Sequence, residues 1–189
     1  MTCIQQQKPI DAIQYLESAL SIIEDAHFPG LRGYILQGLS EAHAMSQHKR
    51  QSWDAIHLAE QLLIAKPGIK ECSYCDITTT SVMAQKGVNA VLLKEYGQAL
   101  PLLNTGLHQY NPMHLRGRAR LIAQKAEAYY GLGCIDESAE TAIDAFHIAH
   151  TIGSQKTIAR VKNLYTLLNS SPYRKEKSVA QLGATLTLN

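Results

Sequence analysis

Large apolar aromatic side chains are scarce in this sequence. Two Phe and one Trp occur among 189 residues, so Leu, Ile, Ala and the nine Tyr must fill the core. No segment reaches the about 20 consecutive apolar residues that a membrane-spanning helix needs. No apolar run follows a basic flank at the N-terminus, as a secretory signal would require. We therefore expect a cytoplasmic protein without a membrane segment.

The sequence also lacks a large excess of charge of either sign. The 18 Lys and Arg nearly balance the 16 Asp and Glu, which leaves a net charge of +2. This excess is too small for a dedicated nucleic-acid or membrane surface, so we expect no direct nucleic-acid binding. The hydrophobic share of 46% is ordinary for a globular chain, and a chain of this length can bury a substantial core as one domain or one continuous solenoid.

Few residues form a pattern typical of catalysis or metal binding. Cys72 and Cys75 make a Cys-x-x-Cys pair, but no second pair completes a zinc site, and a thioredoxin-like role would need a βαβ context. The eight histidines lack a HExxH arrangement, and no Ser or Cys is placed by motif beside a His and an acid. We predict no catalytic residues, no metal site and no cofactor. A thiol redox or metal-binding protein that uses Cys72 and Cys75 is the remote alternative.

Helical patterns cover nearly the whole chain. Small and apolar residues recur at three-to-four-residue spacing, and prolines, glycines and polar turns separate the segments. The clearest stretch is 127–149, where Gly131-Leu132-Gly133 joins two helical patterns. We predict an all-α protein of about eight helices, at residues 9–26, 31–46, 51–65, 77–94, 96–110, 111–130, 136–151 and 154–169. Residues 1–170 would form one helical repeat domain, and residues 171–189 a flexible C-terminal tail.

A fixed internal spacing indicates that these helices pair as repeated hairpins. Small residues on the first and second helix of a hairpin are 12 positions apart (52 − 40, 99 − 87 and 138 − 126), in the pairs Ser40 with Ser52, Gly87 with Ala99, and Ala126 with Ser138. The next close-packing residue follows seven positions later, at Ala59, Gly106 and Ala145. Small residues there let two helix axes approach closely. Because one hairpin cannot bury its apolar faces alone, we predict an α-solenoid of stacked hairpins.

This pattern resembles the tetratricopeptide repeat (TPR) family, whose signature is a small-residue pair across a helical hairpin, an aromatic slot and a trailing proline. The family's Gly/Ala slot is matched at Ser40, Gly87 and Ala126. Its turn glycine is matched by Gly133, whereas Gln47 and Lys94 stand at the equivalent positions. The repeats start 47 and 39 residues apart (87 − 40 and 126 − 87), against about 34 in the family. The resemblance covers residues 9–169 and implies longer helices and loops.

Within that family, the chain is similar to the degenerate repeat domain that follows a helix-turn-helix head in bacterial transcription regulators. The similarity is carried by Leu115-Arg116-Gly117-Arg118-Ala119-Arg120, by the stretch 126–130, and by Gly153-Ser154 before the last helix. It implies the sensing or interaction part of a regulator that lacks its DNA-binding head. The alternative is a free-standing repeat protein whose first helix serves as a cap.

Stacked as in the family, the first helix of each hairpin would line a concave groove. Its inward positions form an apolar-to-mixed surface with few charges: Tyr34, Gln37, Glu41, Val88, Leu92, Arg120, Glu127 and Tyr130. These residues do not match the Lys/Asn/Arg clamp by which some relatives hold chaperone tails. An extended or helical peptide with apolar side chains fits them better. Alternatively, Val88 and Leu92 pack against the next repeat, and Arg120 lies on a solvated helix face.

Besides the remote alternative of a thiol redox or metal-binding protein, the sequence leaves two classes of function. The first is a non-enzymatic protein- or peptide-binding module, because stacked hairpins present a long concave surface but rarely a closed catalytic pocket. The second is a scaffold or dimerisation module without a groove ligand. The helix at 9–26 lacks a hairpin partner, and its uncovered apolar face could pair with a second copy to give a homodimer.

Overall fold

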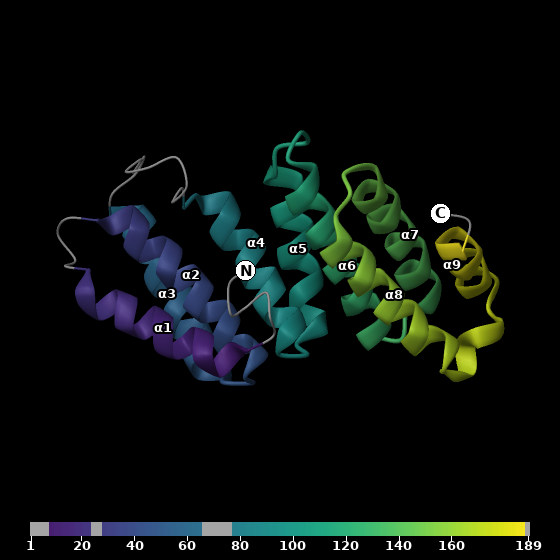
Figure 1. Cartoon of the computed structure of the whole chain (residues 1–189), viewed down its shortest axis with the longest axis horizontal. Coiled ribbons are helices and arrows are strands. Elements are labelled where there is room, and N and C mark those ends of the chain that lie inside the picture. Colours follow the sequence, from purple (N-terminus) through teal and green to yellow (C-terminus); the bar gives the residue numbers. More distant parts are fainter. Residues whose placement is uncertain (1–7, 24–27, 66–76, 188–189) are drawn as a thin grey trace. The chain divides into compact units, whose positions relative to one another are not determined.

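The computed structural model describes residues 8–23, 28–65 and 77–187, and in these residues it contains nine α-helices, one short 3-10 helix and no strand (Figure 1). The all-α prediction is confirmed. The chain divides into two compact units, Met1–Leu93 and Lys94–Asn189, and the repeat domain predicted over residues 1–170 spans both. Among the described helices, none combines the length and the apolar character needed to cross a membrane.

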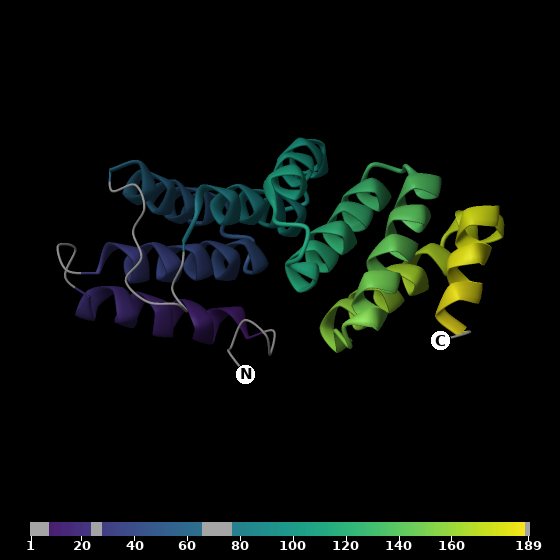
Figure 2. The ribbon, with the colours of Figure 1, turned by 90° about the horizontal axis from the view of Figure 1, so that it is seen from above.

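The first unit contains four helices: α1 (Pro9–Ile22), α2 (Pro29–Met45), α3 (Lys49–Ala65) and α4 (Thr79–Leu92). Pro9 and Pro29 begin their helices, where a missing N–H costs no hydrogen bond. α2 and α3 form a hairpin, and α1 packs along α2 (Figure 2). The four helices share one apolar core, which includes Ile13, Leu36, Ile56 and Val82.

Buried polar side chains join α2, α3 and α4. The Ser52 hydroxyl on α3 donates to the Ser40 carbonyl on α2 at 2.9 Å, so the 12-residue spacing marks a direct hydrogen bond across the hairpin. On α4, Asn89 Nδ2 donates to the Ser40 hydroxyl at 3.0 Å, and Gln85 Nε2 donates to Asn89 Oδ1 at 2.8 Å. All four side chains are buried. We call this set the Ser40 network.

The second unit contains α5 (Tyr96–Gln109), α6 (Leu115–Gly131), α7 (Ile135–Thr151), α8 (Gln155–Asn169), the 3-10 helix η1 (Pro172–Lys175) and α9 (Lys177–Thr187). α6 and α7 form its hairpin, in which the Ser138 hydroxyl donates to the Ala126 carbonyl at 2.9 Å. The 12-residue spacing therefore corresponds to the same hydroxyl-to-carbonyl hydrogen bond in both units. The third predicted pair, Gly87 with Ala99, has one member in each unit and stays a prediction.

The turn that follows a first helix has the same backbone conformation in three places. Gln47, Lys94 and Gly133 lie seven positions after the small residue of each repeat (47 − 40, 94 − 87 and 133 − 126), and their φ angles are 60°, 61° and 78°. Gln47 and Lys94 therefore adopt a left-handed conformation that glycine reaches more cheaply. After Gln47, the His48 N–H donates to the His43 carbonyl at 2.9 Å, which closes the helix end as in a Schellman motif.

The C-terminal segment differs from its prediction. Where the sequence predicts a flexible tail over residues 171–189 and about eight helices, the structure has η1 and then a ninth helix, α9. Val179 and Leu182 are buried in the core of the second unit, and Leu186 packs against it. The Ser178 hydroxyl donates to Asp136 Oδ1 on α7 at 2.6 Å. The Thr-Leu run favours a strand locally, but packing at i, i+3 and i+7 spacing decides for a helix.

Candidate peptide-binding surface

In the first unit, the predicted groove residues of α2 lie on one side of the helix. Tyr34, Gln37 and Glu41 follow three- and four-residue spacing (37 − 34 and 41 − 37), which places them on a common face. Tyr34 is 51% exposed, so its ring is accessible to a partner. Gln37 and Glu41 are half-buried. Gln37 Nε2 donates to the Ser81 carbonyl at 3.0 Å, so this face borders α4.

α4 runs beside α2 in the same direction. Gln37 meets Ser81 near the start of α4, and Gln47, just after α2, donates through Nε2 to the Leu92 carbonyl at the end of α4 at 2.8 Å. Leu92 is half-buried at this end. Val88 is 1% exposed. Its side chain is therefore buried inside the first unit and lies outside the candidate surface.

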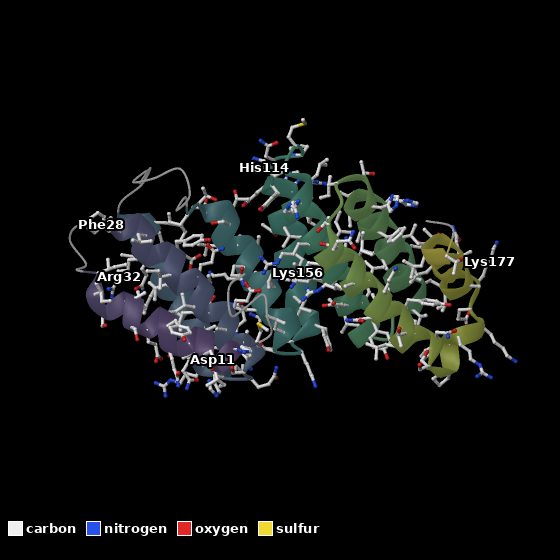
Figure 3. All side chains as sticks on the ribbon, viewed as in Figure 1. Asp11, Phe28, Arg32, His114, Lys156 and Lys177 are labelled. Carbon is white, nitrogen blue, oxygen red and sulfur yellow. The ribbon has the colours of Figure 1, made fainter. Side chains whose placement is uncertain are left out.

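In the second unit, Arg120, Glu127 and Tyr130 are half-buried on α6. Glu127 Oε1 lies 3.4 Å from Arg160 Nε on α8, and each of the two side chains is 27% exposed. Lys156 lies near the start of the same helix (Figure 3). Arg160 is not among the residues that the sequence predicts to line the groove. The ion pair with Glu127 adds it to the candidate surface.

Burial dominates the electrostatics around Glu127. Removal from water raises the pKa of Glu127 above its ordinary value, and the Arg160 guanidinium opposes that shift. The pKa of Tyr96 on α5 is raised as well, first by burial and then by Glu127 and Tyr130. These four side chains form one polar cluster built from α5, α6 and α8. It can offer a ligand a carboxyl group, a guanidinium and two phenol hydroxyls.

Gln124 is a polar residue of α6 that the sequence does not single out. It stands three positions before Glu127 and is 1% exposed. Its Oε1 atom and Arg160 Nη1 are both buried and have no hydrogen-bond partner among the described residues. Such atoms destabilise a protein unless a partner is found. The signal available in the sequence was a glutamine among the small apolar residues Ala123, Ala126 and Ala128.

The remaining sequence candidates add no second site. Cys72 and Cys75 lie outside the described residues. Within the described ranges, no three His, Cys, Asp or Glu side chains are grouped so that they could hold a metal ion. The two sets of groove candidates are each assembled within their own unit, and one groove that combines them stays a prediction.

The fold has a solved counterpart, whereas the sequence does not match a family. No protein-family model matches the chain, and no curated protein matches it either. Among solved structures, the chain is similar to the MamA RS-1 ArsTM double mutant, with a TM-score of 0.53 over 98% of this chain and 87% of that chain, at 16% sequence identity. MamA is a tetratricopeptide-repeat protein. At this identity the likeness shows the fold, which is a TPR-like array of sequential helical hairpins.

Proposed function

We propose that this chain is a non-enzymatic, TPR-like module that binds a protein or peptide partner. The observation that supports this proposal best is the stacking of helical hairpins, which sets first helices side by side: α2 beside α4 in one unit, and α6 beside α8 in the other. Such arrays offer an extended surface for a partner rather than a closed, dry pocket. The TPR-like fold typically serves as an interaction scaffold.

The partner that fits best is an extended or helical peptide with apolar side chains and a few hydrogen-bonding groups. Tyr34 offers a large exposed ring, and aromatic rings often dominate the binding energy of an interface. In the second unit, Glu127 can accept a bond from a peptide N–H, and Arg160 can donate to a peptide carbonyl or carboxylate. Both groups already face each other, so a bound peptide would add to an existing pair.

The proposal is tested by selecting binders from a displayed library of random peptides and measuring amide hydrogen exchange with the best one. We expect slower exchange in α2 around Tyr34 and in α6 around Glu127, because a bound peptide would shield these helices. Slower exchange confined to α3 and α7 would show that the partner binds elsewhere, and failure to select any peptide would count against a peptide-binding role.

Substitutions sharpen the same test. Tyr34→Ala should weaken binding by about tenfold, equivalent to about 1.4 kcal/mol, because it removes an exposed ring without opening the core. Leu58 on α3 is the matched control, since it is 50% exposed on a second helix. Leu58→Ala should leave the affinity unchanged. Equal effects of the two substitutions would contradict the assignment of the surface to α2.

A narrower version of this proposal makes the chain the interaction part of a bacterial transcription regulator, acting in the cytoplasm. It is supported by the similarity of the segments 115–120, 126–130 and 153–154 in the sequence. Sequencing of the genomic neighbourhood tests this version, and a helix-turn-helix reading frame directly upstream of Met1 would support it. A neighbouring reading frame without a helix-turn-helix, together with the absence of a co-purifying DNA-binding partner, would rule out this narrower version.

An apolar surface on α1 favours dimerisation as a second candidate function. Tyr15 is 69% exposed and Ile22 is 80% exposed, and they lie seven residues apart on one face of the helix. Pairing of this face with a second copy would cover both side chains. Sedimentation velocity should then show a dimer that Tyr15→Lys converts to a monomer. A chain that stays monomeric at high concentration would exclude this function.

A further inference from the structure

Two histidines are hydrogen-bonded to each other at the end of α2. His43 lies in the last turn of the helix and is 7% exposed, whereas His48 lies directly before α3 and is exposed. Their Nδ1 atoms are 3.4 Å apart. The His48 N–H also donates to the His43 carbonyl at 2.9 Å, and the His48 carbonyl accepts from the Ser52 N–H at 3.0 Å. His48 therefore joins the end of α2 to the start of α3.

The protonation states of the two imidazoles decide whether their side chains can form this bond. One Nδ1 must carry a hydrogen, and the other must be bare so that its lone pair accepts. A first proton can enter on the donating ring, which keeps its Nδ1–H and then donates more strongly. A second proton must enter on the accepting Nδ1. Two N–H groups, each on a cation, would then point at each other, and the bond would be lost.

The helices packed against α2 do little to offset a second positive charge on His43. α1 contributes Glu17, which is exposed, so water screens its attraction for His43. α4 presents the neutral amide of Asn89 toward α2. α3 begins with two cations, Lys49 and Arg50. A second proton on the histidine pair therefore places a charge in a largely buried position without a close counter-ion.

We propose that the His43–His48 pair is a pH-sensitive switch, which holds the end of the first hairpin closed at neutral pH and releases it in mild acid. Burial and then His48 lower the pKa of His43, and Glu17 opposes that shift. The stabilisation is therefore complete above the ordinary histidine pKa of about 6.5 and is lost as the pH falls below it. Release would reach α4 as well, because Gln47 in the same turn donates to the carbonyl at the end of that helix.

The hairpin of the second unit has the same turn without histidines. Tyr129 and Cys134 stand where the first unit has His43 and His48, three and eight residues after the small residue of each repeat (43 − 40 and 129 − 126; 48 − 40 and 134 − 126). The Cys134 N–H donates to the Tyr129 carbonyl at 3.0 Å, as in the first unit. Phenols and thiols do not ordinarily titrate between pH 5 and 7, so this turn is a control within the same molecule.

The test follows amide hydrogen exchange of the full chain by NMR between pH 7 and pH 5, with each rate divided by the rate of an unstructured chain at the same pH. Protection should fall by about tenfold at His48, because the open state binds one proton more tightly than the closed state. Protection at Cys134 should stay unchanged. In His48→Gln, protection at residue 48 should fall by at most about threefold, because an amide oxygen can accept from a charged His43.

Nitrogen-15 spectra of the imidazoles keep the outcome independent of any folding defect in the variant. In the unsubstituted chain, the ring nitrogens of His43 and His48 should show two separate protonation steps. The amide of His48 should lose its protection with the second step and keep it through the first. Unchanged protection at pH 5, loss with the first step, an equal loss at Cys134, or an undiminished loss in His48→Gln would each overturn the proposal.

Discussion

Removal of the Ser52 hydroxyl measures what the repeated 12-residue spacing contributes to stability. In Ser52→Ala, the buried carbonyl of Ser40 loses a donor at 2.9 Å, which costs about 1–2 kcal/mol. Alanine favours a helix over serine by roughly 0.5 kcal/mol, and this gain partly offsets the loss. Ser18→Ala on α1 is the matched control, because the Ser18 hydroxyl is exposed and bonds only to the Gln14 carbonyl within its own helix. The helix-propensity gain is common to both variants, so their difference isolates the buried bond.

The assay is equilibrium unfolding in urea, followed by tryptophan fluorescence. The sequence contains one Trp, Trp53, which packs against the core of the first unit and therefore reports on that unit. With a slope of about 1–3 kcal/mol per M of urea, the midpoints of Ser52→Ala and Ser18→Ala should differ by roughly 0.5–1 M. If Ser52→Ala is as stable as Ser18→Ala, the hydrogen bond does not hold the hairpin together and the reasoning from spacing to stability fails.

Four further substitutions test the second unit. Lys94→Gly should stabilise the chain by about 0.5–1 kcal/mol, because glycine adopts a φ of 61° without steric cost. Gly131→Ala should destabilise the chain by about 1–3 kcal/mol, since the added methyl group would overlap the Tyr96 ring. Gly97→Ala is its control: the added methyl group meets no atom within 4 Å, so this substitution should stabilise α5 by about 0.5–1 kcal/mol. Glu127 has a raised pKa, so the folded state holds its proton more tightly than the unfolded chain; wild type should gain stability relative to Glu127→Gln as the pH falls from 7 toward 4.5.

Urea unfolding followed by circular dichroism measures each of these changes. A neutral or destabilising Lys94→Gly would show that the left-handed turn carries no strain. Equal responses of the two glycine positions would mean that the Tyr96 contact relaxes without cost. For Glu127, the stability difference from Glu127→Gln is followed across the pH series, and parallel curves for the two proteins would contradict the raised pKa.

The spacing of small residues predicts the hairpins well, because the physical requirement is local to two helices. Ser40 with Ser52 and Ala126 with Ser138 lie where two helix axes approach, and each pair carries the same hydrogen bond. α9 is harder to predict, since its stability comes from contacts with α7 and α8 that lie far away in the sequence. The Thr-Leu run of this short segment locally favours a strand, so the sequence by itself does not predict a helix there.

The candidate surface is less predictable than the fold for a related reason. Periodicity identifies which residues of α6 share a face, but it does not say which residue of α8 reaches Glu127. Arg160 does so through helix packing. The conformation of the turn is equally hard to predict from the sequence, because Gln47 and Lys94 stand in place of the expected glycine yet have the positive φ angle that glycine favours. Only the three-dimensional structure shows that this turn also brings the imidazole of His43 into contact with that of His48.

The Ser40 network has a consequence for how the chain assembles during synthesis. An array of similar hairpins can dock a new helix on the wrong neighbour, because stripes of alanine and leucine resemble one another. Asn89 finds the hydroxyl of Ser40 only when α4 lies in its native register. Any other docking would bury an amide without a partner, at about 1–3 kcal/mol. The completed α2–α3 hairpin therefore offers α4 one matched docking position, and the polar contacts act against misassembly as well as for stability.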